Sequence, residues 1–484
     1  MTVLALRKLA RVATFALLAT WLAGCATRVV YEQPAAPVPA VFPGATGSPP
    51  GGTPAAELPW QNYFNDAQLK VLIEAALRNN RDLRVAVLNI EQARAQAQIR
   101  RADLLPTVNL AAQASRTPVA PSSVATAYTA GLSVTAWEMD VFGRVAGLKD
   151  NALALYLATA ENRKAVHISL VAAVANAYLN LLADEELLGL TRQTLTTREE
   201  SYKLTRLRFD NGASSELDLR LAESLSEGAR ATLAQLQRQR ALDENALVLL
   251  LGQALPAEFK LAPFEPGAAP QAPLAQAPVM AELPAGLPSD LLANRPDIRA
   301  AEQQLVAAYA NVGAARAAFF PRISLTASLG LASSELTTLF QAGAFAYSLA
   351  AQALMPIFDA GRNQAGLDAA AANRDVAIAQ YEKAIQSAFR EVADALAGRA
   401  TFGEQLRAQQ AQADAEAVRY RLSDLRYRNG IANYLDLLDA QRSLFASRQG
   451  VVQTRLALLQ NQVLLYKVLG GGWEEPVKNQ AAKN

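Results

Sequence analysis

The sequence predicts a membrane protein of mixed α and β structure, built from two similar halves. Three observations support this fold class. Four segments alternate apolar with small polar residues, which is typical of strands that face lipid on one side and water on the other. Two segments of about 65 residues contain no proline and have helical periodicity. The chain also repeats its own plan at an offset of 215 to 218 residues.

The internal repeat is clearest in a short turn. LRFDNGASSELDLRLAE begins at Leu207 and LRYRNGIANYLDLLDAQ begins at Leu425, and 8 of the 17 aligned residues are identical. A longer segment from Asn80 aligns in the same way with a segment from Arg295. Matches in the same order at nearly one offset indicate internal duplication rather than chance similarity between alanine-rich helices.

Charge and composition exclude some partners. The chain has 484 residues, with 46 basic against 44 acidic side chains, so no strong positive field indicates nucleic acid as a partner. It is 51% hydrophobic but only 7% aromatic, and alanine supplies much of the apolar content. Alanine favours helices, which agrees with the long helical segments.

The N-terminus indicates export and lipidation. Residues 1–24 have a basic start followed by an apolar run too short to span a bilayer, which is typical of a cleaved signal peptide. The run ends in LAGC, which resembles the bacterial lipobox, and Cys25 is the single cysteine of the chain. We therefore expect lipidation of Cys25, and Ala26 favours sorting to the outer membrane. Disulfide bonds have no role in this chain.

Proline-rich stretches divide the mature chain. Residues 25–59 are expected to form a lipidated tether, extended or simply disordered. Residues 256–290 form a second Pro/Ala-rich stretch, interpreted as an equatorial linker between a first repeat at 60–255 and a second at 291–470. Residues 471–484 form a C-terminal tail.

The alternating segments predict two strands in each half. We expect strands at about 106–118, 126–140, 321–332 and 344–358. A half-buried strand of a soluble sheet would show the same alternation. Ten residues suit a tilted membrane strand, but four strands cannot close a barrel, so a membrane interpretation requires several chains.

Each half is expected to continue as a helical hairpin. The long helices are predicted at 144–208 and 362–428, and the returning helices at 215–251 and 433–469. At 1.5 Å per residue, each long helix would extend over ~100 Å. Apolar residues recur at three- and four-residue spacing, which is the pattern of helices that pack sideways as coiled coils.

Several of these motifs together resemble a known family. The lipobox, WEMDVFGR, PIFDAGR, the run from NRPDIRAAEQ to FFPRISL, YRNGIANYLDLLDAQRSL and LGGGW are similar to the TolC-type outer membrane factors, and to their lipidated, OprM-like branch. The resemblance covers nearly the whole mature chain. It implies a homotrimer whose 12 strands form one outer-membrane β-barrel, continued by a long periplasmic α-helical barrel with an equatorial domain. It also implies two protein partners, a periplasmic membrane-fusion adaptor and an inner-membrane RND transporter, besides outer-membrane lipid.

On that architecture, the two repeated turns lie at the periplasmic tip. Gly212 and Gly430 suit a helix end that needs a positive φ. The resemblance implies that Asn211-Gly212 and Asn429-Gly430 form the tip turns where the adaptor docks.

The second hairpin carries the residues that the resemblance identifies with a gate. Leu435, Asp436 and Asp439 match positions that form an apolar ring and acidic rings at the narrow end of such channels. Tyr427 matches a residue that latches the inner hairpin to the outer one, with its partner at the position of Asp218. Asp218 is also expected to cap the first turn of its own returning helix. Loss of Asp439 or of the Tyr427 hydroxyl is expected to raise conductance.

Other functions find less support in the sequence. It contains no phosphate loop, paired cysteines or histidine cluster, so no catalytic residue, cofactor or metal site is predicted, and the single histidine, His167, is expected to pack between helices. A structural envelope lipoprotein would explain the anchor and helices but not the alternating strands. A type I protein-secretion channel would share the architecture and remains an alternative.

Overall fold

The computed structural model describes residues 29–43, 53–120, 123–261, 274, 280, 283–284 and 288–473. Cys25 and most of the expected equatorial linker and C-terminal tail lie outside these residues. Within them the chain forms two compact units. Unit 1 comprises the N-terminal segment up to residue 36, residues 88–161 and residues 299–383. Unit 2 comprises residues 37–87, 162–298 and the chain from residue 384 onward.

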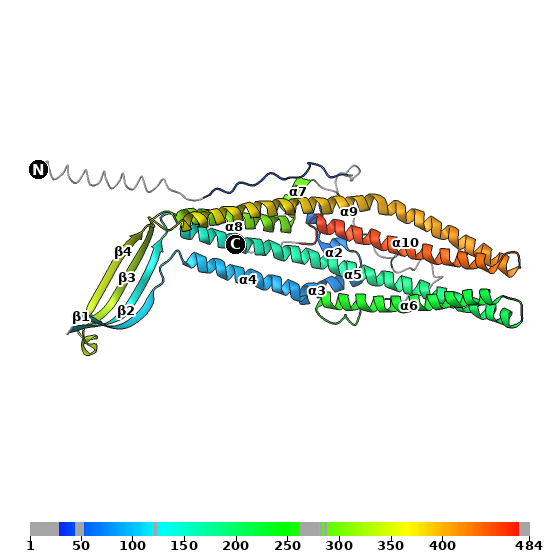
Figure 1. The fold of residues 1–484 in the computed structure, drawn as a ribbon, viewed down its shortest axis with the longest axis horizontal. Coiled ribbons are helices and arrows are strands. Elements are labelled where there is room, and N and C mark those ends of the chain that lie inside the picture. Colours follow the sequence, from blue (N-terminus) through cyan, green and yellow to red (C-terminus); the bar gives the residue numbers. More distant parts are fainter. Residues whose placement is uncertain are drawn as a thin grey trace, which may run out of the picture. The chain divides into compact units, whose positions relative to one another are not determined.

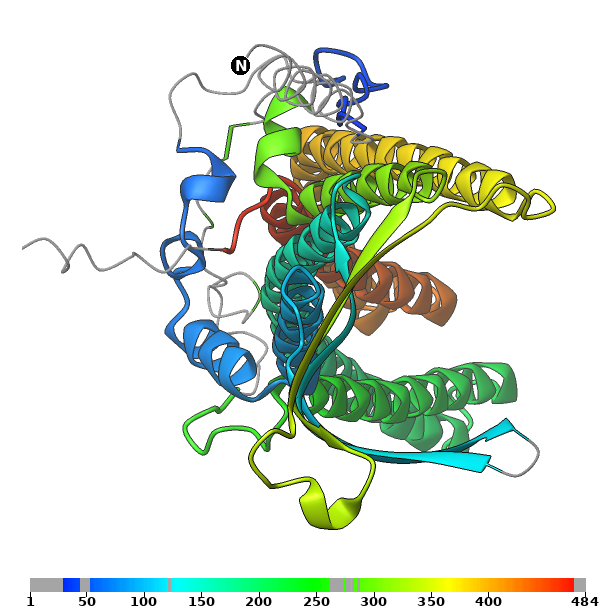
Figure 2. The same ribbon diagram turned by 90° about the vertical axis from the view of Figure 1, so that its left-hand side faces the viewer.

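Unit 1 contains one four-stranded sheet. Neighbouring strands are antiparallel and follow chain order, so the outer strands β1 and β4 each have one unpaired edge. The sheet curves along its strands (Figures 1 and 2). Its strands are β1 (Asn109–Ala120), β2 (Ser123–Met139), β3 (Arg322–Ser333) and β4 (Phe345–Leu354).

The register of the sheet sorts its side chains into apolar and polar rows. One row across the four strands contains Leu110, Leu132, Leu329 and Tyr347, and the adjacent row contains Asn109, Ser133, Ser328 and Ser348. Because successive side chains of a strand point to opposite faces, one face of the sheet is apolar and the other carries small polar groups. All four members of the apolar row are exposed within the single chain.

β4 ends earlier than expected, and β2 has an irregularity within its length. β4 stops at Leu354 instead of 358, and Pro356 follows, which has no N–H to continue the ladder. β2 shows a register shift between Val134 and Trp137, where Ala136 has a φ of 50°. Such a bulge bends a strand and increases its twist.

The sequence repeats follow one order of elements, namely helix, two strands, long helix and returning helix. The two long helices are each 67 residues, which corresponds to ~100 Å, and both have residues in both units. The first copy contains α4 (Arg81–Ala102), α5 (Arg144–Asp210) and α6 (Glu216–Leu251), and the second contains α8 (Pro296–Ala317), α9 (Arg362–Arg428) and α10 (Tyr434–Val468).

The compact units do not coincide with the repeats. Each unit takes residues from both copies, so the repeats at 60–255 and 291–470 are duplicated chain segments and not separately packed domains. The reason is physical. The pairing of β2 with β3 satisfies backbone groups of both strand hairpins, and the packing of α6 against α10 buries apolar side chains of both helical hairpins.

The strand-to-helix junctions in unit 1 are capped by aspartates. Asp140 accepts hydrogen bonds from the backbone N–H groups of Val145 and Ala146, at 3.0 and 2.6 Å. Asp359 accepts from the N–H groups of Gly361 and Asn363 at the start of α9. These are the aspartates of the WEMDVFGR and PIFDAGR motifs, so the motifs begin the long helices by satisfying otherwise unpaired N–H groups.

Unit 2 also contains short helices that periodicity did not predict. They are α2 (Trp60–Tyr63), α3 (Ala67–Asn79) and α7 (Pro288–Asn294), besides the 3-10 turn Ala55–Glu57. A second 3-10 turn, Leu336–Thr338, lies in unit 1. Tyr63 of α2 stacks on Tyr466 of α10, with ring centroids 3.9 Å apart, and donates to the carbonyl of Gln462. α2 is thereby held on the end of α10.

Among the described helices, α5 alone has a window apolar and long enough to cross a membrane by length and composition. Most of that window is buried inside the structure, as in the core helix of a soluble protein. The apolar window of α5 is therefore weak evidence that this helix crosses a membrane.

Candidate functional site

The two repeated turns end α5 and α9 with the same backbone geometry. Gly212 and Gly430 have φ values of 72° and 71°, which confirms the expected positive φ. Asn211 and Asn429 each donate a side-chain hydrogen bond of 2.7 Å to a carbonyl four residues earlier. Each of these carbonyls also accepts from the backbone N–H of the same asparagine, so the side-chain bonds reinforce the last turn of each helix. Figure 1 shows both helical hairpins closing at these turns.

The candidate gate residues lie on one face of α10. Leu435, Asp436 and Asp439 are exposed, whereas Leu437 and Leu438, which lie between Asp436 and Asp439, are buried. Positions three and four residues apart share a face of a helix. The opposite face packs within the chain, so the three candidate residues project away from that packing.

The buried face of α10 belongs to a cluster that joins the two hairpins. The cluster contains two residues of α6 and three of α10, and side chains of α5 and α9 pack against it. Ser201 of α5 also shares a 2.9 Å hydrogen bond with the hydroxyl of Tyr434. The buried members are Ala222, Leu225, Tyr434, Leu437 and Leu438, and the partly buried ones are Tyr202, Leu221, Tyr420 and Tyr427.

Tyr427 links the hairpins through a different partner from the one expected. Its hydroxyl oxygen accepts a 2.7 Å hydrogen bond from the guanidinium of Arg208, which also lies over the tyrosine ring at 5.1 Å. Burial raises the pKa of the Tyr427 hydroxyl, and Arg208 opposes this shift. The expected bond to Asp218 is therefore a wrong prediction for this structure, although both residues lie close enough to interact electrostatically.

Asp218 caps the N-terminus of its own helix, α6. Its carboxylate accepts hydrogen bonds from the Ser214 and Ser215 hydroxyl groups and from the Ser215 N–H, while the Ser215 hydroxyl accepts from the Asp218 N–H. This reciprocal arrangement is a capping box at the start of α6. The predicted capping role of Asp218 is thus confirmed, and all of the bonds that its carboxylate accepts involve its Oδ2 atom.

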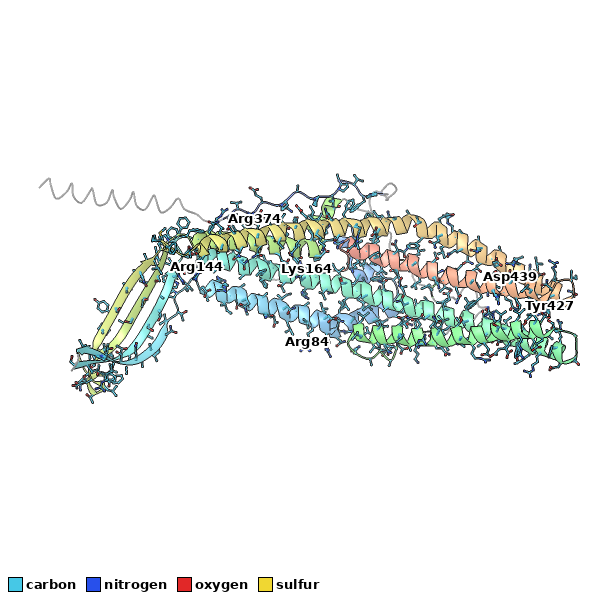
Figure 3. The ribbon with its side chains drawn as sticks, viewed as in Figure 1. Arg84, Arg144, Lys164, Arg374, Tyr427 and Asp439 are labelled. Atoms are coloured by element: carbon cyan, nitrogen blue, oxygen red, sulfur yellow. The ribbon has the colours of Figure 1, made fainter. Side chains whose placement is uncertain are left out.

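Asp439 forms an ion pair within its own hairpin. Arg419 of α9 donates a short hydrogen bond to the Asp439 carboxylate and also binds Glu416 at 3.2 Å. Both side chains of the Arg419–Asp439 pair are about half exposed, so water screens the pair. Figure 3 shows Asp439 and Tyr427 near the end of the α9–α10 hairpin. The negative charge at Asp439 is therefore partly compensated.

The family assignment rests on a sequence comparison. A model described as "Outer membrane efflux protein" matches residues 72–253 and 287–471, which is well over half of the chain. The chain belongs to the outer membrane efflux protein family. Proteins of this family serve transport, and this efflux protein is accordingly an exit duct of the outer membrane with a large periplasmic helical part. The mixed α and β fold expected from the sequence is confirmed.

Individual relatives agree with this assignment. The efflux protein is 46% identical over 464 residues to "Toluene efflux pump outer membrane protein TtgC" and to "Antibiotic efflux pump outer membrane protein ArpC", both from Pseudomonas putida, covering 94% of each chain. It is 40% identical to the Neisseria gonorrhoeae MtrE outer membrane channel, whose structure was solved in an open state. The TM-score is 0.82 over 93% of this chain and 98% of MtrE.

Sequence reasoning missed Arg208 and Arg419, the two arginines that hold candidate gate residues. Each lies on the helix that precedes a tip turn. Arg208 is 219 residues from Tyr427 along the chain, and Arg419 is 20 residues from Asp439. Within the described part of the chain, no cluster of three or more histidine, cysteine or acidic side chains is suited to hold a metal ion.

Proposed function

We propose that this efflux protein assembles as a homotrimer that conducts small organic compounds outward and is gated at the α9–α10 hairpin. In this proposal Leu435, Asp436 and Asp439 narrow the duct, and Tyr427 with Arg208 holds the gate closed. The observation that carries it is the placement of all three gate residues on the exposed face of α10, while its other face is tied to α5 and α6.

The sheet supports a trimer. Its four strands leave unpaired edges on β1 and β4, and an open edge cannot persist in lipid because unpaired N–H and C=O groups there are costly. Pairing β4 of one copy with β1 of the next, in three copies, would give a closed 12-stranded barrel. The apolar row through Leu132 and Leu329 would then face lipid, and the serine row would face the lumen.

The names of the relatives support the cargo and the partners. Those proteins are named for toluene and antibiotic efflux pumps, so we propose small, largely apolar organic compounds as cargo. A pump needs an inner-membrane transporter of the RND type and a periplasmic adaptor. The adaptor is proposed to dock at the turns Asn211-Gly212 and Asn429-Gly430. Lipidation of Cys25 is proposed to add a second attachment to the outer membrane.

Single-channel conductance of the reconstituted protein tests the gate. Tyr427→Phe removes the hydroxyl that accepts from Arg208, and a hydrogen bond to a charged group contributes about 1.5–3 kcal/mol. We expect several-fold higher conductance, or more frequent opening, for Tyr427→Phe and for Asp439→Ala.

Tyr202→Phe is the matched control for this experiment. The Tyr202 hydroxyl accepts from Arg206 on the same helix, so its loss breaks no bond between hairpins. Wild-type conductance in Tyr427→Phe and Asp439→Ala, with unchanged ion selectivity, would refute the gate assignment. Export of a protein rather than small compounds by the reconstituted system would favour the type I secretion alternative.

A further inference from the structure

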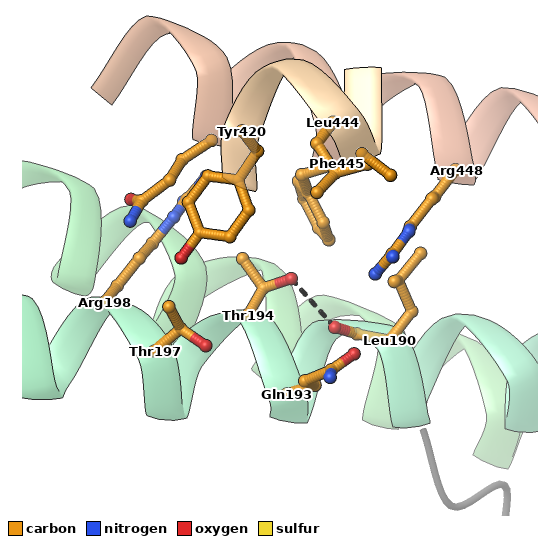
Figure 4. Close-up of a pocket in the computed structure, with 11 residues that line it drawn as sticks. Leu190, Gln193, Thr194, Thr197, Arg198, Tyr420, Leu444, Phe445 and Arg448 are labelled. Atoms are coloured by element: carbon orange, nitrogen blue, oxygen red, sulfur yellow. Dashed lines mark hydrogen bonds between the residues drawn. The ribbon is translucent and has the colours of Figure 1, made fainter. Parts of the chain in front are cut away.

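A cavity of about 180 Å³ lies within unit 2, between α5, α9 and α10. Figure 4 shows Leu190, Thr194 and Arg198 on α5, facing Tyr420, Leu444 and Phe445 from the other two helices. The guanidinium of Arg448 points from α10 toward α5. None of the candidate gate residues lines this cavity.

The cavity wall contains two buried side chains with polar atoms that lack partners. Arg198 is 8% exposed, and its Nε has no hydrogen-bond partner in the described structure, whereas one terminal nitrogen donates to the Leu225 carbonyl at 3.1 Å. Gln441 is 9% exposed, and its Oε1 also lacks a partner there. Buried polar atoms are rarely left unpaired, so the Arg198 Nε–H is a donor available to an acceptor group of a ligand, whereas the Gln441 oxygen would require a donor.

The charge around the cavity is positive and uncompensated. Arg198 and Arg448 line it, Arg442 lies close enough to lower the pKa of Arg198 further than burial already does, and no aspartate or glutamate is among the lining residues. Arg198 remains positively charged despite its lowered pKa, because a guanidinium group is not deprotonated in proteins. A buried charge without a counter-charge is costly, and water cannot supply that counter-charge.

The rest of the wall is apolar and aromatic. Leu190 and Leu444 are buried, and Arg198 lies over the Phe445 ring at 5.4 Å from its centroid. Ligand cavities typically combine apolar walls with a few polar groups that orient the ligand, and cavities between the helices of a bundle are among their usual places. An inorganic anion would satisfy the arginines but leave the apolar wall without contact.

We propose that this cavity is a binding site for a small organic carboxylate. Its carboxylate would bind Arg198 and Arg448, and its apolar part would lie against Leu190, Leu444 and Phe445. Because the walls come from both helical hairpins, binding favours the arrangement in which the hairpins are packed together. The proposal is independent of the gate, since it requires only the cavity and its charges.

Calorimetric titration of the full-length protein in detergent tests the site. Benzoate is the probe, benzamide is its neutral analogue, and phosphate is an anion without an apolar part. We expect saturable benzoate binding at least 10-fold tighter than that of benzamide or phosphate, together with a higher melting temperature at saturation. Equal binding of benzoate and benzamide, or no binding of benzoate, would overturn the proposal.

Two variants locate the binding. Arg448→Gln should weaken benzoate binding at least 10-fold, and Arg198→Gln should abolish it if that variant folds. Arg238→Gln is the matched control, because Arg238 is an exposed residue of α6 that does not line the cavity. If Arg448→Gln binds benzoate as tightly as Arg238→Gln does, the bound anion is elsewhere and the assignment is wrong.

Discussion

Single polar contacts at the hairpin ends add to the apolar cluster that joins the two hairpins. Two hydrogen bonds join them there, from Arg208 to Tyr427 and between Ser201 and Tyr434. Each contributes only about 1–3 kcal/mol, so a docking partner could exchange them for its own contacts. The Arg419–Asp439 pair acts differently, because it lies within one hairpin and changes the charge presented by α10.

Removal of Arg419 should therefore change ion selectivity. Arg419→Gln leaves Asp439 uncompensated, so each ring of three acidic groups in the proposed trimer becomes more negative. We expect higher cation selectivity, measured as a shift of the reversal potential in a salt gradient, and a larger shift at low ionic strength. Arg421→Gln removes the same charge from a neighbouring exposed position of α9 and serves as the control. Equal shifts in both variants would contradict a specific role of Arg419.

A buried carboxyl pair predicts a pH dependence of stability. Burial, followed by the hydrogen bond with Asp243 of α6 and the negative charges of Asp243 and Glu185, raises the pKa of Asp184 on α5 to about 7, and Arg240 opposes this shift. Between pH 4 and 7 the folded protein keeps a proton that the unfolded chain releases. The stability contributed by this group is therefore complete below pH 4 and is lost as the pH rises to 7.

Asp184→Asn should remove this dependence. At pH 8 we expect the variant to be about 1–3 kcal/mol more stable than the wild type, and the difference should shrink toward pH 5. Thermal unfolding in detergent between pH 5 and 9 measures it. A wild-type pH profile that Asp184→Asn leaves unchanged would show that the proton belongs to another group.

At the scale of elements, one glycine of α9, Gly398, allows α10 to approach closely. A Cβ on Gly398 would collide with the side-chain amide of Asn461, which is buried and donates a 2.9 Å hydrogen bond to the Ala395 carbonyl. Gly403, one and a half turns later on α9, has nothing within 4 Å of the same position. The two glycines therefore sit in opposite environments on one helix.

This contrast predicts opposite effects of the same substitution. Gly398→Ala should destabilise the protein by about 1–3 kcal/mol, because the buried amide must move. Gly403→Ala should stabilise it by up to about 1 kcal/mol, because alanine is the better helix former and meets no neighbour. Chemical denaturation of both variants measures the two changes. Equal effects would mean that helix propensity, and not the contact between α9 and α10, governs both positions.

At the scale of the whole molecule, the strands and the lipid anchor are separable attachments to the membrane. Cys25→Ser should abolish incorporation of labelled palmitate. In the proposed barrel it should leave the protein in the outer-membrane fraction after carbonate extraction, because the strands still span the bilayer. A structural lipoprotein without a barrel would instead become soluble. The fractionation result therefore separates the channel from its structural alternative.

Local features of this protein were predictable because they depend on nearby residues. The alternation in segments such as 322–333 reports a strand directly, since its period is set by backbone geometry. The same holds for the long helices and for Gly212 and Gly430, where a repeated turn needs a positive φ.

α2 was missed because it has only four residues and its position depends on the packing of Tyr63 on Tyr466. α3 has 13 residues with buried positions such as Leu69, Leu72 and Ile73 at helical spacing, so its pattern was present in the sequence and was overlooked.

The candidate site shows where local reasoning stops. The structure places Leu435, Asp436 and Asp439 on one exposed face of α10, and this relation follows from their spacing along a single helix. The partner of Tyr427 was wrong, because Arg208 and Asp218 lie on either side of the same turn, and only the fold shows that Arg208 reaches the Tyr427 hydroxyl while Asp218 caps α6.

The sequence by itself determined the four strands, the long helices and their returning partners, the order that both halves share, and the family, because periodicity, turn chemistry and motifs are written in consecutive residues. Tertiary structure alone decided which copies pack into each compact unit, which arginines hold Tyr427 and Asp439, and where a positive cavity forms between α5, α9 and α10. The reason is that these contacts join residues far apart in the chain. Their geometry follows from how the helices pack, which no local pattern records.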